Sequence, residues 1–172
     1  MPFQIIPAGS ADVAEITALV NSAYRGDSAR RGWTHEAELL GGTRTDEADI
    51  KNILNAPGYS ILKYVKNGRV MGCVELKLEV DRLYLGMLTV NPDLQGKGIG
   101  KALMKAAEDY AINKRCGTVF MTVISVRGEL IAWYNRHGYH ATGERRPFDF
   151  TDPRFGKPKQ QLEFLVLEKK LE

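Results

Sequence analysis

The stretch from Val90 to Lys101, V-N-P-D-L-Q-G-K-G-I-G-K, constrains the fold of this chain more than any other part of the sequence. It joins an apolar run over 83–90 to a helical pattern over 99–114. The junction contains three alternating glycines, Gly96, Gly98 and Gly100. Glycine permits unusual backbone angles and lets a bulky anion approach the backbone, and the helix N-terminus adds N–H donors. The junction therefore predicts an anion site, and phosphate is the anion that suits it best.

The spacing of these glycines excludes two common phosphate motifs. The P-loop pattern G-x-x-x-x-G-K-[ST] is absent, and Lys101 takes the last glycine position of the dinucleotide pattern G-x-G-x-x-G. What remains is Gln95-x-x-Gly98-x-Gly100, preceded by Val90-x-Pro92. This arrangement resembles the pyrophosphate loop of the GNAT acetyltransferase superfamily, V-x-P-x-x-[QR]-x-x-G-x-[GA], at every defined position. The alternative is a strand-to-helix turn that binds nothing.

A second segment, W-Y-N-R-H-G-Y over Trp133–Tyr139, resembles the late Y-x-x-x-G-[FY] signature of the same superfamily. The two signatures stand in the family's order, and the resemblance covers roughly residues 60–142. It implies an α/β fold in which helices flank both faces of a mixed, mostly antiparallel sheet. The strands over 82–90 and 118–124 would be parallel and splay apart, with the pantetheine arm of acetyl-CoA in the opening.

The resemblance also implies an activity, the acetyl-CoA-dependent N-acetylation of an amine on a small molecule or peptide within a ternary complex. Tyr134 matches the family's general-acid tyrosine and would protonate the CoA thiolate, although a core tyrosine with a satisfied hydroxyl is the alternative. A backbone N–H between Leu88 and Val90 would stabilise the oxyanion. The predicted cofactor-binding residues are Leu88, Thr89, Val90, Gln95, Gly96, Lys97, Gly98, Ile99, Gly100 and Lys101.

The general base is less well defined, because Tyr84 stands where many family members carry a glutamate. In the neighbouring strand, apolar and polar residues alternate over 74–81, so one face is buried and the other is wet or lines a cleft. Glu75 and Glu79 lie on the polar face. Glu75 is the predicted catalytic residue here, acting through water, and a plain solvated role is the alternative for both glutamates.

Periodicity and turn residues predict alternating strands and helices. The predicted strands cover 3–6, 59–66, 70–80, 82–90, 118–124, 139–142 and 161–168, and Asn67-Gly68 marks a hairpin. The predicted helices run from Ser10, as N-cap, to Tyr24, from Asp46 to just before Pro57, over 99–114, and from Glu129 to His137, which Gly138 ends. A further short helix is expected over 34–40.

Composition limits the class of protein. The chain of 172 residues is 44% hydrophobic and 26% charged, which favours one globular domain over residues 1–172. No apolar run approaches about 18 residues, so no membrane partner is expected, and the N-terminus lacks a signal-peptide pattern. Cys73 and Cys116 match no metal spacing, which favours reduced thiols, a cytoplasmic location and no metal. Residues 91–172 carry 14 basic and 10 acidic side chains without a basic stripe, so no nucleic-acid partner is expected.

Two irregular segments are predicted to serve the acceptor or an assembly. Residues 29–36 and Arg44 combine arginines with Trp33, which suits an acceptor bearing a carboxylate or phosphate, and a solvated loop is the alternative. The segment 143–160 carries three prolines, three phenylalanines and five basic residues without a period. A flap over the acceptor cleft and a packing arm at a homodimer interface are both open.

Two other functions stay open at this point. A GNAT-like domain can hold CoA or acyl-CoA as a sensor without turnover, and an acyltransferase can use a longer acyl chain. The retained Tyr134 favours turnover over sensing. Acyl length depends on the depth of the pocket beside the thioester.

Overall fold

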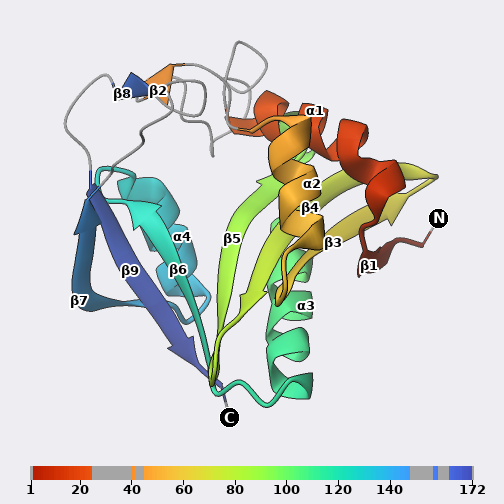
Figure 1. Cartoon of the computed structure of the whole chain (residues 1–172). Coiled ribbons are helices and arrows are strands. Elements are labelled where there is room, and N and C mark those ends of the chain that lie inside the picture. The colour runs from red at the N-terminus through yellow and green to blue at the C-terminus, as the bar shows by residue number, and fades with distance from the viewer. Residues whose placement is uncertain (1, 25–39, 42–44, 148–156, 159–162, 172) are drawn as a thin grey trace.

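A seven-stranded mixed sheet lies at the centre of the molecule, with strand order β1-β3-β4-β5-β6-β9-β7 (Figure 1). The structure is a computed structural model that describes residues 2–24, 40–41, 45–147, 157–158 and 163–171. The strands of this sheet are β1 (Gln4–Pro7), β3 (Tyr59–Lys66), β4 (Arg69–Leu78), β5 (Arg82–Val90), β6 (Thr118–Ile124), β7 (His140–Pro147) and β9 (Glu163–Lys170). Two short strands, β2 (Leu40–Gly41) and β8 (Lys157–Pro158), pair separately.

β5 and β6 are the parallel pair, and they separate soon after they begin. Their register covers three residue pairs, from Arg82 opposite Thr118 to Tyr84 opposite Phe120. Beyond these pairs the two strands diverge, so the sheet opens into a V (Figure 1). The predicted bounds of both strands, their parallel direction and their splay are confirmed.

Helices cover both faces of the sheet, as predicted. α1 (Val13–Tyr24) and α2 (Glu47–Asn55) pack on one face, where Ile16 and Ile50 are completely buried. α3 (Ile99–Asn113) packs on the other face through Leu103, and burial of such a side chain contributes roughly 1.5–3 kcal/mol. α4 (Gly128–Arg136) adds its buried Tyr134 to the same cluster as α3.

Local signals account for most of these boundaries. Asn67 and Gly68 both have positive φ, at 55° and 75°, and this conformation makes the tight turn between β3 and β4. Asp46 caps α2, because its carboxylate accepts a hydrogen bond from the Asp49 N–H at 2.8 Å. Gly138, at φ 94°, follows the end of α4.

The prediction that Ser10 caps the first helix is wrong. Ser10–Asp12 form a 3₁₀ turn whose N-cap is Gly9, and α1 begins only at Val13. The Asp12 carboxylate accepts a hydrogen bond from the Gly9 N–H at 2.8 Å and pairs with Lys63, also at 2.8 Å. The charged side chain of Asp12, held by a strand far away in sequence, therefore sets the start of this segment.

Two further boundaries differ from the predictions. β4 ends at Leu78 rather than Val80, whose side chain is fully exposed in the turn before β5. The segment 143–160 is not one irregular loop, because β7 continues to Pro147 and Lys157–Pro158 form β8. A bulge between Ala141 and Arg145 shifts the register and lets β7 resume pairing with β9. The expected helix over 34–40 lies outside the described residues except for Leu40, which belongs to β2.

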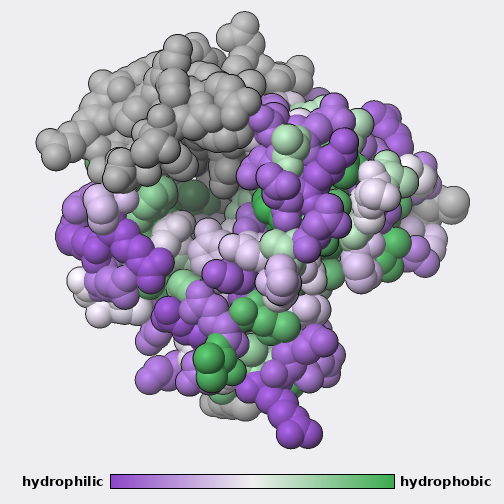
Figure 2. Space-filling model, in the orientation of Figure 1, coloured by the Kyte–Doolittle hydropathy of each residue, from purple (hydrophilic) through white to green (hydrophobic). Residues whose placement is uncertain are grey.

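Hydrophilic side chains predominate among the coloured residues on the face shown in Figure 2. Within the described ranges, no helix combines the length and apolarity that a membrane span needs. The same ranges contain no group of three or more His, Cys, Asp or Glu side chains arranged to hold a metal ion.

Candidate functional site

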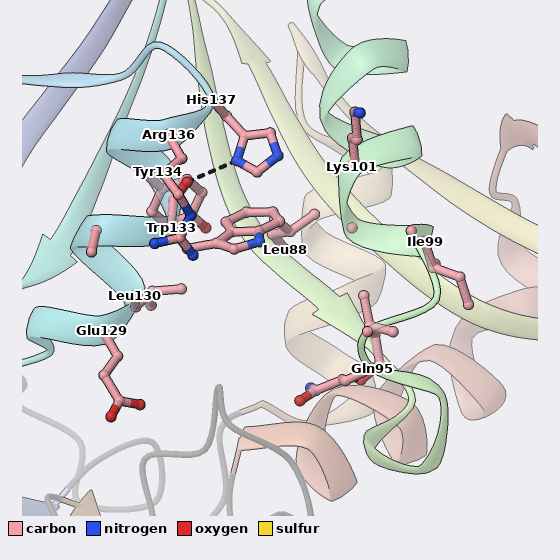
Figure 3. Close-up of a pocket in the computed structure, with 15 residues that line it drawn as sticks. Leu88, Gln95, Ile99, Lys101, Glu129, Leu130, Trp133, Tyr134, Arg136 and His137 are labelled. Atoms are coloured by element: carbon pink, nitrogen blue, oxygen red, sulfur yellow. Dashed lines mark hydrogen bonds between the residues drawn. The ribbon is translucent and has the colours of Figure 1, made fainter.

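A cavity of about 660 Å³ lies between the start of α3 and the inner side of α4, with the end of β5 at its back (Figure 3). Its predicted lining residues come from β5 and the glycine loop: Leu88, Val90, Gln95, Gly96, Gly98, Ile99, Gly100 and Lys101. α4 supplies the rest: Glu129, Leu130, Ala132, Trp133, Tyr134, Arg136 and His137. The structure thus brings the two sequence signatures to opposite walls of one cavity.

The glycine loop follows a short 3₁₀ turn and ends as the N-cap of α3. Gly96 and Gly98 have φ values of 88° and 84°, in the left-handed region that favours glycine. A Cβ added at either position would meet no heavy atom within 4 Å, so both glycines border open space. Gly98 caps α3 without any side-chain hydrogen bond. The first-turn N–H groups of α3 therefore face a site that an external anion can approach.

On the opposite wall, Trp133 lies near Gly100 of this loop. A Cβ on Gly100 would lie 3.4 Å from the Trp133 indole, which is van der Waals distance, so a larger side chain at this position would meet the ring. The His137 and Trp133 rings have centroids 4.4 Å apart, and His137 Nδ1 lies 2.7 Å from the Trp133 carbonyl oxygen. Because a carbonyl oxygen only accepts, Nδ1 carries the hydrogen of this bond. Trp133 and His137 thus form one aromatic surface of the cavity (Figure 3).

Tyr134 is buried at the inner end of α4. Its ring makes edge contacts with Trp133 and Tyr139, at centroid distances of 5.2 and 6.1 Å. Its backbone carbonyl accepts hydrogen bonds from the N–H groups of His137, at 3.0 Å, and Tyr139, at 3.1 Å. Ring and backbone contacts together hold Tyr134 at the cavity wall where the family resemblance places the general acid.

Tyr139 belongs to a polar cluster behind this wall. Its hydroxyl donates to Glu108 Oε2 at 3.0 Å, and Lys169 Nζ lies 3.1 Å from the other oxygen of that carboxylate. Burial, followed by the Glu108 charge, raises the pKa of Tyr139 well above its usual value. Tyr139 therefore stays protonated and joins α4 to α3 and β9.

A bulge in β5 shapes the back of the cavity. Cys73 of β4 pairs with Thr89, whereas Glu75 pairs with Gly86, so Met87 and Leu88 together lie opposite one β4 residue. Met87 has φ 51°, and the buried Thr89 hydroxyl donates to the Met87 carbonyl oxygen at 2.8 Å. Leu88 lines the cavity, whereas Thr89, which was also predicted to bind the cofactor, does not.

Glu75 lies across the sheet from this cavity. Its register partner is Gly86, and a Cβ on Gly86 would stand 2.6 Å from the Tyr84 ring and 2.7 Å from its hydroxyl oxygen. Tyr84 therefore folds back over Gly86 toward the strand position opposite Glu75. Glu75 is half-buried and does not line the cavity, so the structure does not bring the predicted base and the predicted acid together in one cavity lining.

Sequence reasoning missed much of the α4 wall. It assigned no role in the site to Glu129, Trp133, Arg136 or His137. Their spacing was nevertheless informative, because residues 129, 130, 133, 134 and 137 recur at helical intervals and share one face. Lys97, in contrast, is exposed and does not line the cavity, whereas Lys101 does. The predicted acceptor residues 29–36 and Arg44 lie outside the described residues.

Several solved acetyltransferase structures resemble this chain in fold. Over its full length the chain resembles the ribosomal-protein-S18-alanine N-acetyltransferase of Escherichia coli, with a TM-score of 0.73, 16% identity, and coverage of 99% of this chain and 95% of that one. The chain also resembles a PaiA N-acetyltransferase from Thermoplasma acidophilum that was solved with coenzyme A. The TM-score is 0.69 at 16% identity, and the match covers 99% of this chain and 100% of that one. A third similar structure is YncA, a putative acetyltransferase from Salmonella typhimurium that was solved with acetyl-CoA. The TM-score is 0.69 at 22% identity, and the match covers 99% of this chain and 94% of that one.

A search of curated proteins finds no match. These structural likenesses, all below 25% identity, concern the fold. The model of the acetyltransferase (GNAT) family matches residues 14–139, which include the glycine loop, the β5 bulge and the whole α4 wall. The chain therefore belongs to the GNAT acetyltransferase family.

Proposed function

We propose that this protein transfers an acetyl group from acetyl-CoA to an amine of a small molecule or peptide. One observation carries the proposal: Tyr134 and the glycine loop line the same cavity, with the end of β5 between them. The loop is suited to the pyrophosphate of CoA, since Gly96 and Gly98 leave room for an anion at the N-terminus of α3. The opening between β5 and β6 is the route by which the pantetheine arm would reach the acceptor side of the sheet.

The reaction needs three functions from the protein. The amine nitrogen attacks the thioester carbon, and the oxygen of the tetrahedral intermediate takes the negative charge. Backbone N–H groups of the segment Leu88–Val90 are proposed to stabilise this oxyanion, because the bulge turns that part of β5 to the cavity. When the C–S bond breaks, Tyr134 is proposed to give its hydroxyl proton to the CoA sulfur.

The nitrogen must lose a proton, and Glu75 is the proposed acceptor of it. Its position opposite Gly86 lies on the side of β5 away from the CoA cavity, and an amine approaching from that side would reach the thioester through the V. Gly86 stands two residues before Leu88, and the proposed route for the proton from the amine to Glu75 runs through water. The Tyr84 hydroxyl, folded over Gly86, lies next to this path.

Mass spectrometry tests the proposal. The purified protein is incubated with acetyl-CoA and a pool of primary amines, including polyamines, amino acids and short peptides, and the products are identified by mass. We expect one amine class to gain an acetyl group at the rate of thiol release. Turnover that Glu75→Gln does not slow would remove Glu75 from the mechanism.

Two other results would point to the alternatives. Tight CoA binding without any acetylated product across the pool would favour a sensor. Faster turnover with propionyl-CoA or butyryl-CoA would favour a longer acyl donor.

A further inference from the structure

Tyr84 stands at the point where the sheet divides. It forms with Phe120 the last residue pair of the parallel ladder between β5 and β6, and beyond this pair the two strands diverge (Figure 1). The two rings lie 5.4 Å apart between centroids, at a tilt of 58°, and Phe120 is almost completely buried. The Arg82 guanidinium carbon lies 3.9 Å from the centroid of the same Phe120 ring. The Tyr84 ring is therefore packed against a buried partner at the apex of the V.

Gly86 lets the Tyr84 side chain lie along β5. A glycine inside a strand often marks a close approach, and Gly86 is such a case. A Cβ at this position would stand 2.6 Å from Tyr84 Cε2 and 2.7 Å from the Tyr84 hydroxyl oxygen. Residues 84 and 86 leave the same face of the strand, so the ring runs from Tyr84 over Gly86. The hydroxyl thus lies past the last ladder pair, in the divided part of the sheet.

Glu75 shares this face with the Tyr84 hydroxyl. Glu75 is the register partner of Gly86, and residues opposite each other in antiparallel strands point the same way, with Cβ atoms roughly 5 Å apart. Because the hydroxyl oxygen lies 2.7 Å from the Cβ position of Gly86, it lies within roughly 8 Å of the Glu75 Cβ. The Glu75 carboxylate extends beyond that Cβ. The hydroxyl and the carboxylate therefore belong to one polar group on this face.

We propose that Tyr84 is a further catalytic residue, which takes a proton from the acceptor amine and passes one on to Glu75. The inference rests on the proposed function, because it takes the attack of an amine on a CoA thioester as the reaction. Most amines arrive as ammonium ions at neutral pH and attack only when neutral. One N–H bond breaks, and its electron pair stays on nitrogen as the attacking pair. The proton goes to the Tyr84 oxygen while the proton already there passes through water to the Glu75 carboxylate, which later releases it to solvent.

A phenol hydroxyl suits this relay because it donates one hydrogen bond and accepts others at the same time. Tyr84 receives a proton as it gives one, so it stays neutral and no phenolate with its pKa near 10 has to form. Glu75 supplies the negative charge that draws the proton away. The two residues therefore act as one unit, and the loss of either should interrupt the same step.

Two small amines test the proposal in a thiol-release assay with acetyl-CoA and the full chain. Methylamine is an ammonium ion at neutral pH and must lose a proton, whereas hydroxylamine is already neutral. We expect Tyr84→Phe to slow methylamine turnover by about 10²-fold and hydroxylamine turnover much less, with CoA affinity unchanged. The methylamine deficit should shrink as pH rises, because the neutral fraction grows about tenfold per pH unit below the amine pKa. A role in packing alone would slow both amines equally at every pH.

Gly86→Ala gives a second, independent variant. Gly86 is not among the glycines with positive φ, so alanine fits its backbone, and the atoms in its way belong to the far end of the Tyr84 ring. We expect the ring to move and methylamine turnover to fall as in Tyr84→Phe, with no further fall in the double variant. The matched control is Tyr59→Phe, which removes a hydroxyl from the same face two strands away from β5. Melting curves check that each variant is folded.

The outcomes separate this inference from the proposed function. If folded Tyr84→Phe turns methylamine over at the native rate, or loses the same factor for both amines at every pH, Tyr84 is not a relay and the proposed function stands. Losses that add up in the double variant would contradict the position of the hydroxyl over Gly86. Absence of thiol release and of acetylated product from the native chain, with both probes and with the whole amine pool, overturns the inference and the proposed function together.

Discussion

Gly98 offers a sharp test of the anion site, because its replacement separates backbone strain from charge. Its φ of 84° costs most residues about 1–2 kcal/mol, but asparagine and aspartate adopt this left-handed region more readily. A Cβ at Gly98 meets no heavy atom within 4 Å, so the fold has room for either side chain. Gly98→Asn and Gly98→Asp should therefore unfold at similar temperatures.

The two variants should differ strongly in CoA binding. An aspartate about 5 Å from a pyrophosphate with two negative charges would cost about 1.5 kcal/mol in a water-like dielectric and several times more in a drier site. This corresponds to a further loss of roughly tenfold to hundredfold in affinity for Gly98→Asp over Gly98→Asn.

Isothermal calorimetry with CoA in dilute buffer measures the difference, and repetition at about 1 M salt should reduce it. Melting curves for all variants verify that they are folded. If folded Gly98→Asp and Gly98→Asn bind CoA equally well in dilute buffer, the pyrophosphate does not lie at the N-terminus of α3.

Three further predictions follow from neighbouring residues. Tyr134→Phe keeps the buried ring, so it should lower kcat by about 10²-fold or more with CoA affinity nearly unchanged, and wild-type turnover would assign Tyr134 to the core. Lys101→Ala should weaken CoA in a salt-dependent way, and more than Lys97→Ala, because Lys97 is exposed and does not line the cavity; equal losses for the two variants would contradict this. Tyr139→Phe removes the hydrogen bond to Glu108 and should lower the free energy of unfolding by about 1–2 kcal/mol in a denaturant titration, without a change in CoA affinity.

Features that depend on a few adjacent residues were predictable from the sequence. The bounds of β5 and β6 follow from apolar runs closed by turn residues, and the start of α2 follows from the Asp46 cap. The glycine loop was predictable for the same reason, since positive φ at Gly96 and Gly98 limits the residue type at each position. In these places the local preference and the final structure agree.

Features that arise from contacts between distant segments were not predictable. The bulge at Met87 gives a non-glycine residue φ 51°, and nothing local marks it, because it results from the register that β4 imposes on β5. The start of α1 depends on Asp12 and its partner Lys63, 51 residues away. The places of Arg136 and His137 in the cavity lining depend on how α4 lies relative to the start of α3.

The short parallel seam between β5 and β6 has a mechanical consequence. Three residue pairs join the two halves of the sheet, and beyond Tyr84 and Phe120 no ladder connects them. A ligand held on one side by the glycine loop and on the other by α4 would act as a wedge that cross-links the halves. It would resist separation of the two halves, and its binding would raise the free energy of unfolding of the chain.

By mass action, a ligand present at 100 times its Kd adds about 2.7 kcal/mol to the free energy of unfolding. Amide hydrogen exchange along 85–90 and 121–124 should slow most, since these are the strand segments that face each other across the gap. The stability of the sheet should therefore report whether the cavity is occupied. Thermal melting or amide hydrogen exchange can measure this before any acceptor is known.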